Sequence, residues 1–204
     1  IEDVTEKLGQ PDPVKLEIFN NLLKSIAEEM GITLQNTSYS VNIKERLDFS
    51  CAIFDRTGQL IANAPHIPVH LGSMSESVHS LIQAKTLQPG DVYIANNPYN
   101  GGTHLPDITA ITPIFLPTST TPYFYVASMP PHSTSIEQEG ILIDNFQLVA
   151  SGQFRRAEVL SLLTDCQYPA RNPQQNIADL QAQIAANERG VHALLATIER
   201  YGID

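Results

Sequence analysis

The sequence predicts an α+β fold, a mixed α/β domain with a mainly antiparallel sheet and flanking helices. Three observations lead to this fold class. Apolar residues recur at helical spacing towards both ends of the chain, short strand-like runs fill the middle, and the two do not alternate as in βαβ units. With 204 residues, 42% of them hydrophobic, the chain is long enough to bury a core. We expect one domain over residues 1–204.

The first half of the chain carries two helix patterns and one hairpin pattern. A helix is expected over residues 13–35, where Asp12 fits the N-cap position and Pro13 the first helical position. Two apolar runs within residues 49–65 surround a turn that contains Gly58, which indicates a β-hairpin. A second helix is expected over residues 71–83, because its apolar residues recur at steps of three and four.

The second half begins with strand patterns and ends in a long helix. Strands are expected within residues 91–96, 107–115, 123–128 and 140–149. From Asn172 to about Tyr201 the helical spacing returns, and Gly190 inside this segment is expected to bend or divide the helix. A sequence that ends just after a long amphipathic helix suggests a domain cut from a larger protein.

Composition excludes some classes of function. The chain has 22 acidic and 12 basic residues and a net charge of −10, which disfavours nucleic acid as a partner. No stretch is long and apolar enough to span a membrane, and no leader pattern is seen, so we expect a soluble protein. Cys51 and Cys166 lack the spacing of a zinc knuckle or a disulfide scaffold, which fits a cytoplasmic location.

The segment NNPYNGGTHLPD, residues 96–107, is the first candidate site. Its glycines allow a tight turn that presents His104 and Asp107 rather than burying them. An imidazole nitrogen and a carboxylate oxygen can bind one divalent metal ion. Spacing alone leaves a second interpretation open, in which His104 is a hydrogen-bonded loop residue and Asp107 caps a turn.

The segment APHIPVHLGS, residues 64–73, is the second candidate. His66 and His70 lie in a proline-stiffened stretch before a helix whose free N–H groups attract anionic groups. The alternative is a polar surface loop. His79 and His192 fall within helix patterns and are weaker candidates. The sequence has no Walker-type loop, no dinucleotide-binding glycine motif and no G-x-S-x-G motif, so no nucleotide site is expected on this chain.

Four sequence blocks, in the same order and covering the chain from about Asp12 to Gly202, resemble the hydantoinase B family, and within it the hydantoinase B half of 5-oxoprolinases. They are NIKERLDFSCAIFDRTGQLIANAPHIPVHLGSM, LQPGDVYIANNPYNGGTHLPDITAITPIF, MPPHSTSIEQEG and DLQAQIAANERG. The chain is therefore identified as the N-terminal portion of a hydantoinase B-type domain.

This resemblance implies ATP-dependent hydrolysis of the lactam of 5-oxo-L-proline to L-glutamate, a reaction of glutathione metabolism. A hydantoinase A-type half or subunit is expected to bind ATP, while this half provides a metal-centred hydrolytic site. The resemblance implies His104 and Asp107 as ligands of a divalent metal ion. His70 and His66, whose rings the proline-stiffened segment can orient towards one pocket, are expected in catalytic roles. The fragment alone is expected to be inactive, and the full enzyme to be a homo-oligomer.

Two other interpretations stay open. Hydantoinases and ketone carboxylases share the two-part plan, so a hydantoin or a ketone is an alternative substrate. The family also carries an insert of about a dozen residues, with paired histidines, at the point where Ser128 meets Met129 here. Those histidines would supply the remaining metal ligand. Without them the chain could instead be a non-catalytic assembly module that docks on the ATP-binding half.

Overall fold

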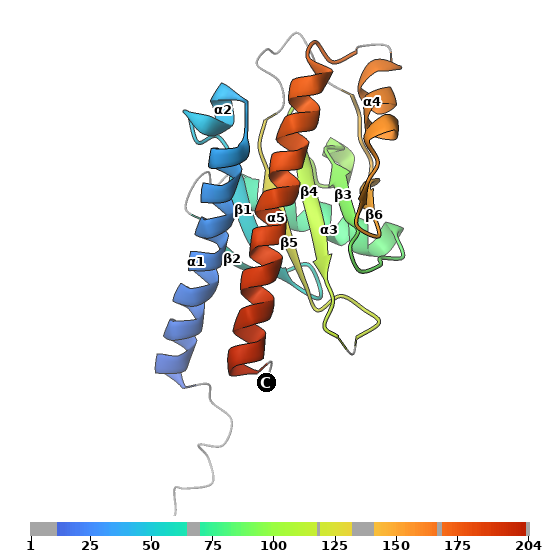
Figure 1. Ribbon diagram of the computed structural model, residues 1–204. Coiled ribbons are helices and arrows are strands. Elements are labelled where there is room, and N and C mark those ends of the chain that lie inside the picture. Colours follow the sequence, from blue (N-terminus) through green and yellow to red (C-terminus); the bar gives the residue numbers. More distant parts are fainter. Residues whose placement is uncertain (1–11, 65–69, 118, 132–140, 167–168, 203–204) are drawn as a thin grey trace, which may run out of the picture.

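The computed structural model describes residues 12–64, 70–117, 119–131, 141–166 and 169–202, and the side chain of Leu71 is not described. These residues form three layers (Figure 1). A twisted antiparallel sheet lies in the middle, α1 and α5 cover one of its faces, and α3 covers the other. The predicted α+β fold with a mainly antiparallel sheet and flanking helices is confirmed.

Two long helices and several short ones make up the outer layers. The long helices are α1 (Pro13–Thr37) and α5 (Pro173–Tyr201). The shorter elements are α2 (Val41–Lys44), α3 (His70–Ala84), α4 (Arg156–Thr164) and a single 3₁₀ turn, η1 (Pro98–Asn100).

The sheet has seven strands in the order β2-β1-β5-β4-β3-β6-β7, and every neighbouring pair is antiparallel. The strands are β1 (Ser50–Asp55), β2 (Leu60–Asn63), β3 (Val92–Ala95), β4 (Thr109–Ile114), β5 (Phe124–Met129), β6 (Phe146–Ala150) and β7 (Gln153–Phe154).

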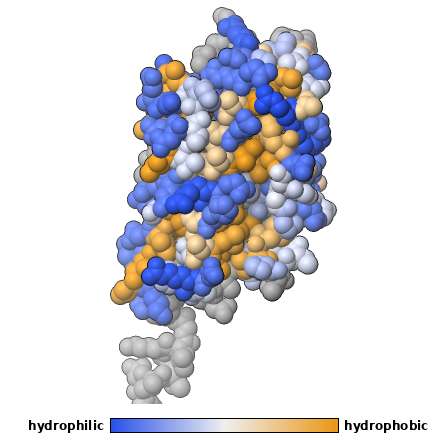
Figure 2. Space-filling model, viewed as in Figure 1, coloured by the Kyte–Doolittle hydropathy of each residue, from blue (hydrophilic) through white to orange (hydrophobic). Residues whose placement is uncertain are grey.

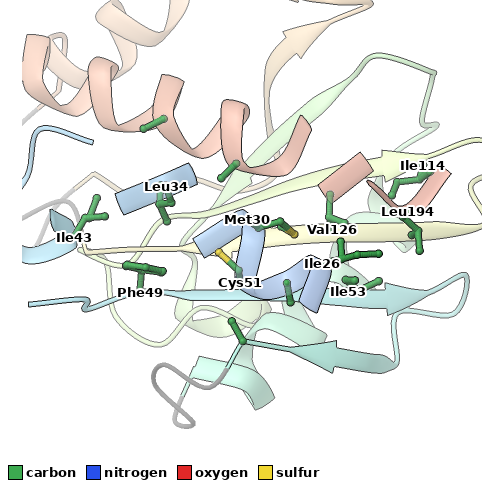
Figure 3. Close-up of a cluster of buried hydrophobic side chains, with 14 residues drawn as sticks. Ile26, Met30, Leu34, Ile43, Phe49, Cys51, Ile53, Ile114, Val126 and Leu194 are labelled. Atoms are coloured by element: carbon green, nitrogen blue, oxygen red, sulfur yellow. The ribbon is translucent and has the colours of Figure 1, made fainter. Parts of the chain in front are cut away.

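Side chains of one strand alternate between the two helical layers, as the pleat of a strand requires. On β1, Ile53 packs in a cluster with α1 and α5, while Ala52 and Phe54 pack with α3. Figure 3 shows the first cluster, in which Met30 of α1 and Leu194 of α5 meet side chains of the central strands. The sheet is therefore buried on both faces, one covered by α1 and α5 and the other by α3.

Two buried amides on α5 attach this helix to the sheet. The Nε2 of Gln183 donates to the carbonyl oxygens of Ile108 (3.0 Å) and Ser128 (2.9 Å), and the Nδ2 of Asn187 donates to the Ala110 carbonyl (3.0 Å). A buried amide without partners would cost about 1–3 kcal/mol, so these contacts favour one register of α5 on the sheet.

Most of the longer elements were predicted from the sequence, whereas the short elements α2, η1 and β7 were not. Asp12 caps α1 by accepting from the N–H of Val14 at 3.0 Å, and the hairpin closes at Gly58 with φ +87°. The strand expected within residues 140–149 begins only at Phe146 in β6, and α4 was not predicted. α4 has no side-chain hydrogen bond at its N-cap, so it lacks a common sequence signal of a helix start.

Gly190 does not divide the last helix, because α5 runs unbroken from Pro173 to Tyr201. A Cβ atom at Gly190 would overlap the side chain of Met30 on α1 and press on Val126 of β5. The glycine allows the close approach of two helices and a strand, which explains its place in an otherwise regular helix.

The helical face seen in Figure 2 is a mixture of polar and apolar surface, with hydrophobic residues reaching the lower end of α1. There Val14, Leu16 and Ile18 are all more than half exposed. Within the described part of the chain, no helix combines the length and the apolar character needed to cross a membrane.

Gly190→Val should destabilise the chain by about 1–3 kcal/mol, because the added methyl groups overfill the contact between α1, α5 and β5. Gly72→Ala is the matched control, since a Cβ atom there meets nothing within 4 Å and alanine favours the helix. Urea unfolding monitored by circular dichroism measures both. Equal free energies of unfolding for wild type and Gly190→Val would contradict the packing role of Gly190.

Candidate functional site

The buried carboxylate of Asp107 is the centre of the candidate site. One of its oxygens, Oδ2, accepts from the hydroxyl of Thr103 at 2.8 Å and lies 3.0 Å from Nδ1 of His104. The Nε2 of His70 lies 3.7 Å from the same oxygen. Asp107 is 2% exposed, so this single oxygen gathers three side chains in a place that solvent hardly reaches.

The site lies at one end of the sheet, against the layer that contains α3. His70 is the first residue of α3, and the other ligand-type residues come from the loop between β3 and β4. Asp107 also forms an isolated antiparallel bridge with Pro131, just beyond the end of β5. Three segments that are distant in sequence therefore meet at this carboxylate.

Gly101 and Gly102 explain how the loop reaches α3. Gly101 has φ +94°, and a Cβ atom there would overlap the backbone of Glu76 and Ser77 in α3. A Cβ atom at Gly102 would overlap the backbone of Asn96. The loop packs backbone to backbone against the helix, and the Ser77 hydroxyl donates to the Gly101 carbonyl at 3.0 Å.

Asn96 fixes the other side of the loop. Its Nδ2 donates to the carbonyl oxygens of Leu105 (2.6 Å) and Ile141 (2.8 Å), and its Oδ1 accepts from the N–H of Ile143 (2.6 Å). The backbone N–H of Asn96 also donates to the Ile143 carbonyl at 3.0 Å, so the segment before β6 is attached to the end of β3 through this one residue.

His70 is held from both sides of its ring. Its Nδ1 lies 3.1 Å from the hydroxyl oxygen of Ser50, the first residue of β1, while its Nε2 faces Asp107. The Ser73 hydroxyl donates to the backbone carbonyl of His70 at 2.8 Å. His70 is only 5% exposed and Ser50 is fully buried, so the ring has little freedom to turn.

The structure brings three of the four predicted site residues together, His70, His104 and Asp107, and His66 lies outside the described residues. The expectation that the loop presents both His104 and Asp107 is wrong for Asp107, which is buried because the loop folds back onto α3. The His104 side chain is 62% exposed. His79 and His192 each lie within ion-pair distance of a glutamate of their own helix, Glu76 and Glu188.

Sequence reasoning missed Thr103, whose hydroxyl donates to Asp107, and Ser50, whose hydroxyl contacts the ring of His70. Thr103 directly precedes His104, so its position offered a local signal. Ser50 offered none, because its contact with His70 depends on how β1 lies beside α3. The nearby Cys51 points to the opposite layer, and burial raises the pKa of its thiol, so it is no candidate nucleophile.

The spacing of His104 and Asp107 fits two ligands of one divalent ion. With bonds of about 2.0–2.2 Å, neighbouring ligand atoms lie roughly 3–3.5 Å apart, and the observed separation is 3.0 Å. The Thr109 hydroxyl, two residues beyond Asp107, is buried without a partner in the described structure. Within that structure, however, no three histidine, cysteine, aspartate or glutamate side chains form a complete set of ligands.

An open groove of about 720 Å³ runs between α3 and the η1 loop. Its lining is largely polar and includes Ser73, Glu76, His79, Tyr99 and Asn100. Gly72 and Gly102 also line it, two residues after His70 and one residue before Thr103. The groove is therefore bordered by the helix and the loop that also carry His70 and Asp107, although neither of these two residues lines it.

Comparisons with known proteins agree with this architecture. The profile of the hydantoinase B/oxoprolinase family matches residues 12–204. The chain is 46% identical to 5-oxoprolinase 1 of Arabidopsis thaliana and 44% identical to 5-oxoprolinase of Saccharomyces cerevisiae, with 94% of this chain covered in each case. It spans only 17% of the length of either relative.

A solved structure, the ATP-dependent caprolactamase from Pseudomonas jessenii, has the same fold. It superposes with a TM-score of 0.79 and 26% identity, covering 96% of this chain and 36% of that one. The described elements thus form the same arrangement in a chain whose sequence has diverged considerably.

The Arabidopsis relative has residues that this chain lacks. The match runs over 216 positions, but 94% of the 204 residues accounts for only about 192 of them. The sequence analysis expects such an insert between Ser128 and Met129. In the structure this junction lies inside β5, where Ser128 pairs with Cys51 and Met129 pairs with Ser50.

Gly101→Ala should destabilise the chain by about 1–3 kcal/mol, since it adds both backbone strain and overlap with α3. Gly152→Ala is the control, because Gly152 also has positive φ (+80°) but open space around it. Comparing the two by urea unfolding isolates the contribution of the contact with α3. Equal losses of stability would show that the loop does not depend on this contact.

Proposed function

Because the chain belongs to the hydantoinase B/oxoprolinase family, we propose that it is part of an ATP-dependent 5-oxoprolinase. In this proposal it contributes the hydrolytic site that opens the lactam of 5-oxo-L-proline to L-glutamate. The identity to 5-oxoprolinases over almost the whole chain supports this substrate. The structural neighbour is by name also an ATP-dependent enzyme acting on a lactam.

The observation that carries the proposal is the meeting of His70 and His104 at one carboxylate oxygen of Asp107. His104 and Asp107 would hold a divalent metal ion. When bound, such an ion lowers the pKa of a water molecule and stabilises negative charge on oxygen. The buried imidazole of His70 would accept a proton from the attacking water.

ATP is assigned to a hydantoinase A-type partner half. An unstrained lactam is a poor electrophile, and phosphorylation of its oxygen converts that oxygen into part of a leaving group. Water then adds to the ring carbon, the ring C–N bond breaks, and the ring nitrogen takes up a proton as the amino group. A second water then hydrolyses the resulting γ-glutamyl phosphate to glutamate and inorganic phosphate. This chain has no phosphate-binding glycine motif, which supports a division of the reaction between two halves.

His104→Ala and Asp107→Asn in the full-length enzyme should each lower bound metal and reduce 5-oxoproline hydrolysis by more than about 100-fold, since even outer-shell partners of a metal contribute 10–100-fold. ATP binding by the partner half should be unchanged. His192→Ala, an exposed histidine on α5, is the control. Elemental analysis and glutamate formation measure the effects, and full metal content with full activity in both variants would refute the assignment.

The 204-residue chain by itself should show no ATP hydrolysis and form no glutamate from 5-oxoproline and ATP. The physical reason is the absence of a phosphate-binding motif and of a complete set of metal ligands in the described residues. Adding the hydantoinase A-type half in trans is the informative comparison. Glutamate formation by the purified chain alone, above background, would overturn the division of labour.

A non-catalytic assembly module is the second candidate function. It is favoured by the incomplete set of ligands among the described residues and by the positions present only in the relative. Elemental analysis of full-length protein purified without chelators separates the two candidates. A stoichiometric transition metal supports the enzyme, and its absence supports the module. Hydantoins and ketones belong in the same substrate panel as 5-oxoproline, because the two-part plan does not fix the substrate.

A further inference from the structure

We propose that the first turns of α1 are a docking surface for the part of the full-length protein that follows Tyr201 along the same polypeptide. Residues 13–18 are called the overhang below, because they extend beyond the last turn of α5. Three of its side chains, Val14, Leu16 and Ile18, are 66%, 61% and 53% exposed. Apolar side chains gathered in this way are typical of a surface that another part of a protein covers. The inference does not depend on the proposed function.

The overhang is defined by the level at which the two long helices meet. α1 and α5 run side by side in opposite directions, so the start of α1 lies beside the end of α5 (Figure 1). There the ring of Phe19 makes an edge contact with the ring of Tyr201, with 5.5 Å between the ring centroids. At 1.5 Å per residue, residues 13–18 continue α1 for about 9 Å beyond this contact. α1 therefore passes the end of its neighbour.

Leu16 lies on the side of α1 that packs into the core. Leu16, Leu23 and Met30 are spaced by seven residues, which places them on one side of the helix. Met30 is buried against Gly190 of α5, and Leu23 is partly buried in the same cluster. The apolar side of α1 thus continues beyond α5, to the level where the chain leaves that helix. Gly202, with φ +83°, caps the helix there.

Val14 and Ile18 form a second apolar stripe on the overhang. They are four residues apart and therefore neighbours on the helix surface. At 3.6 residues per turn this pair lies opposite Leu16, with Lys15 and Glu17 on the two sides between. A helix of a globular protein usually has one apolar stripe, which faces its core. A second stripe on the opposite side indicates a second contact.

Size and chain length favour the same polypeptide as the occupant over a second copy. A specific interface between two proteins buries about 800 Å² and roughly 20–30 residues on each side, whereas the overhang offers three apolar side chains. A contact within one chain needs less area, because its two sides are tethered. The matched region is only 17% of each 5-oxoprolinase relative and 36% of the caprolactamase chain, so such proteins have much more chain to supply the contact.

Photo-cross-linking in the full-length protein identifies the occupant. With p-benzoylphenylalanine in place of Leu16 or Ile18, mass spectrometry should find cross-links within one chain to residues that follow position 204. Mixing unlabelled and ¹⁵N-labelled protein separates these from cross-links between chains. Gln174, exposed at the other end of α5, is the control position and should not capture the same peptides.

The other possible occupants are outcomes of the same experiment. Cross-links to residues before position 12, to the hydantoinase A-type half or to a second copy would each overturn the proposal. The absence of any cross-link from both positions would also overturn it, as would capture of the same peptides from position 174.

A matched pair of variants of the full-length protein provides an independent measurement. Leu16→Asn should lower the urea midpoint of unfolding by about 0.5 M, because it places an amide in an apolar contact. Lys15→Asn has the same loss of helix propensity at an exposed neighbouring position and should leave the midpoint nearly unchanged. Equal midpoints for the two variants would contradict a covered Leu16. If Leu16→Asn does not fold, the cross-linking result still decides.

Discussion

A charged side chain buried at the end of a sheet has to be surrounded by donors, and the carboxylate of Asp107 imposes this requirement on the whole site. An isolated buried carboxylate costs several kcal/mol, so its position is stable only with partners nearby. Thr103 and His104 supply them from its own loop, and His70 approaches from α3. The loop and the helix start are therefore coupled through one oxygen atom.

The chain segments beside Asp107 are attached to α5, the helix on the other face of the sheet. Gln183 of α5 donates to the carbonyl oxygens of Ile108, the residue after Asp107, and of Ser128, near the end of β5. The two strands are thus connected by one buried amide from the layer that does not contain the site. The helix that attaches these chain segments is thus a different one from α3, whose residues border the groove.

Local signals in the sequence were sufficient for the long helices, the hairpin and the central strands, but not for α2, α4 or β7. Helical spacing with Asp12 as a cap predicted α1, and the turn at Gly58 predicted the hairpin. The H-x-x-D spacing and the glycines marked the loop, but the burial of Asp107 could not be foreseen, because it depends on packing between the loop and α3. Ser50 and Gln183 were missed for the same reason, since their partners lie 20 to 75 residues away in sequence.

The choice between an enzyme and an assembly module depends on one junction in β5. Residues inserted after Ser128 would take the place of Met129 opposite Ser50, on the face where His70 and Asp107 meet. The chain would then have to rejoin the backbone bridge between Pro131 and Asp107. Additional residues at this point would therefore enter the site itself, whereas the same residues elsewhere in the sheet would not. The geometry around Asp107 is compatible with an enzyme and with an assembly module. The presence or absence of inserted residues between Ser128 and Met129 decides between the two.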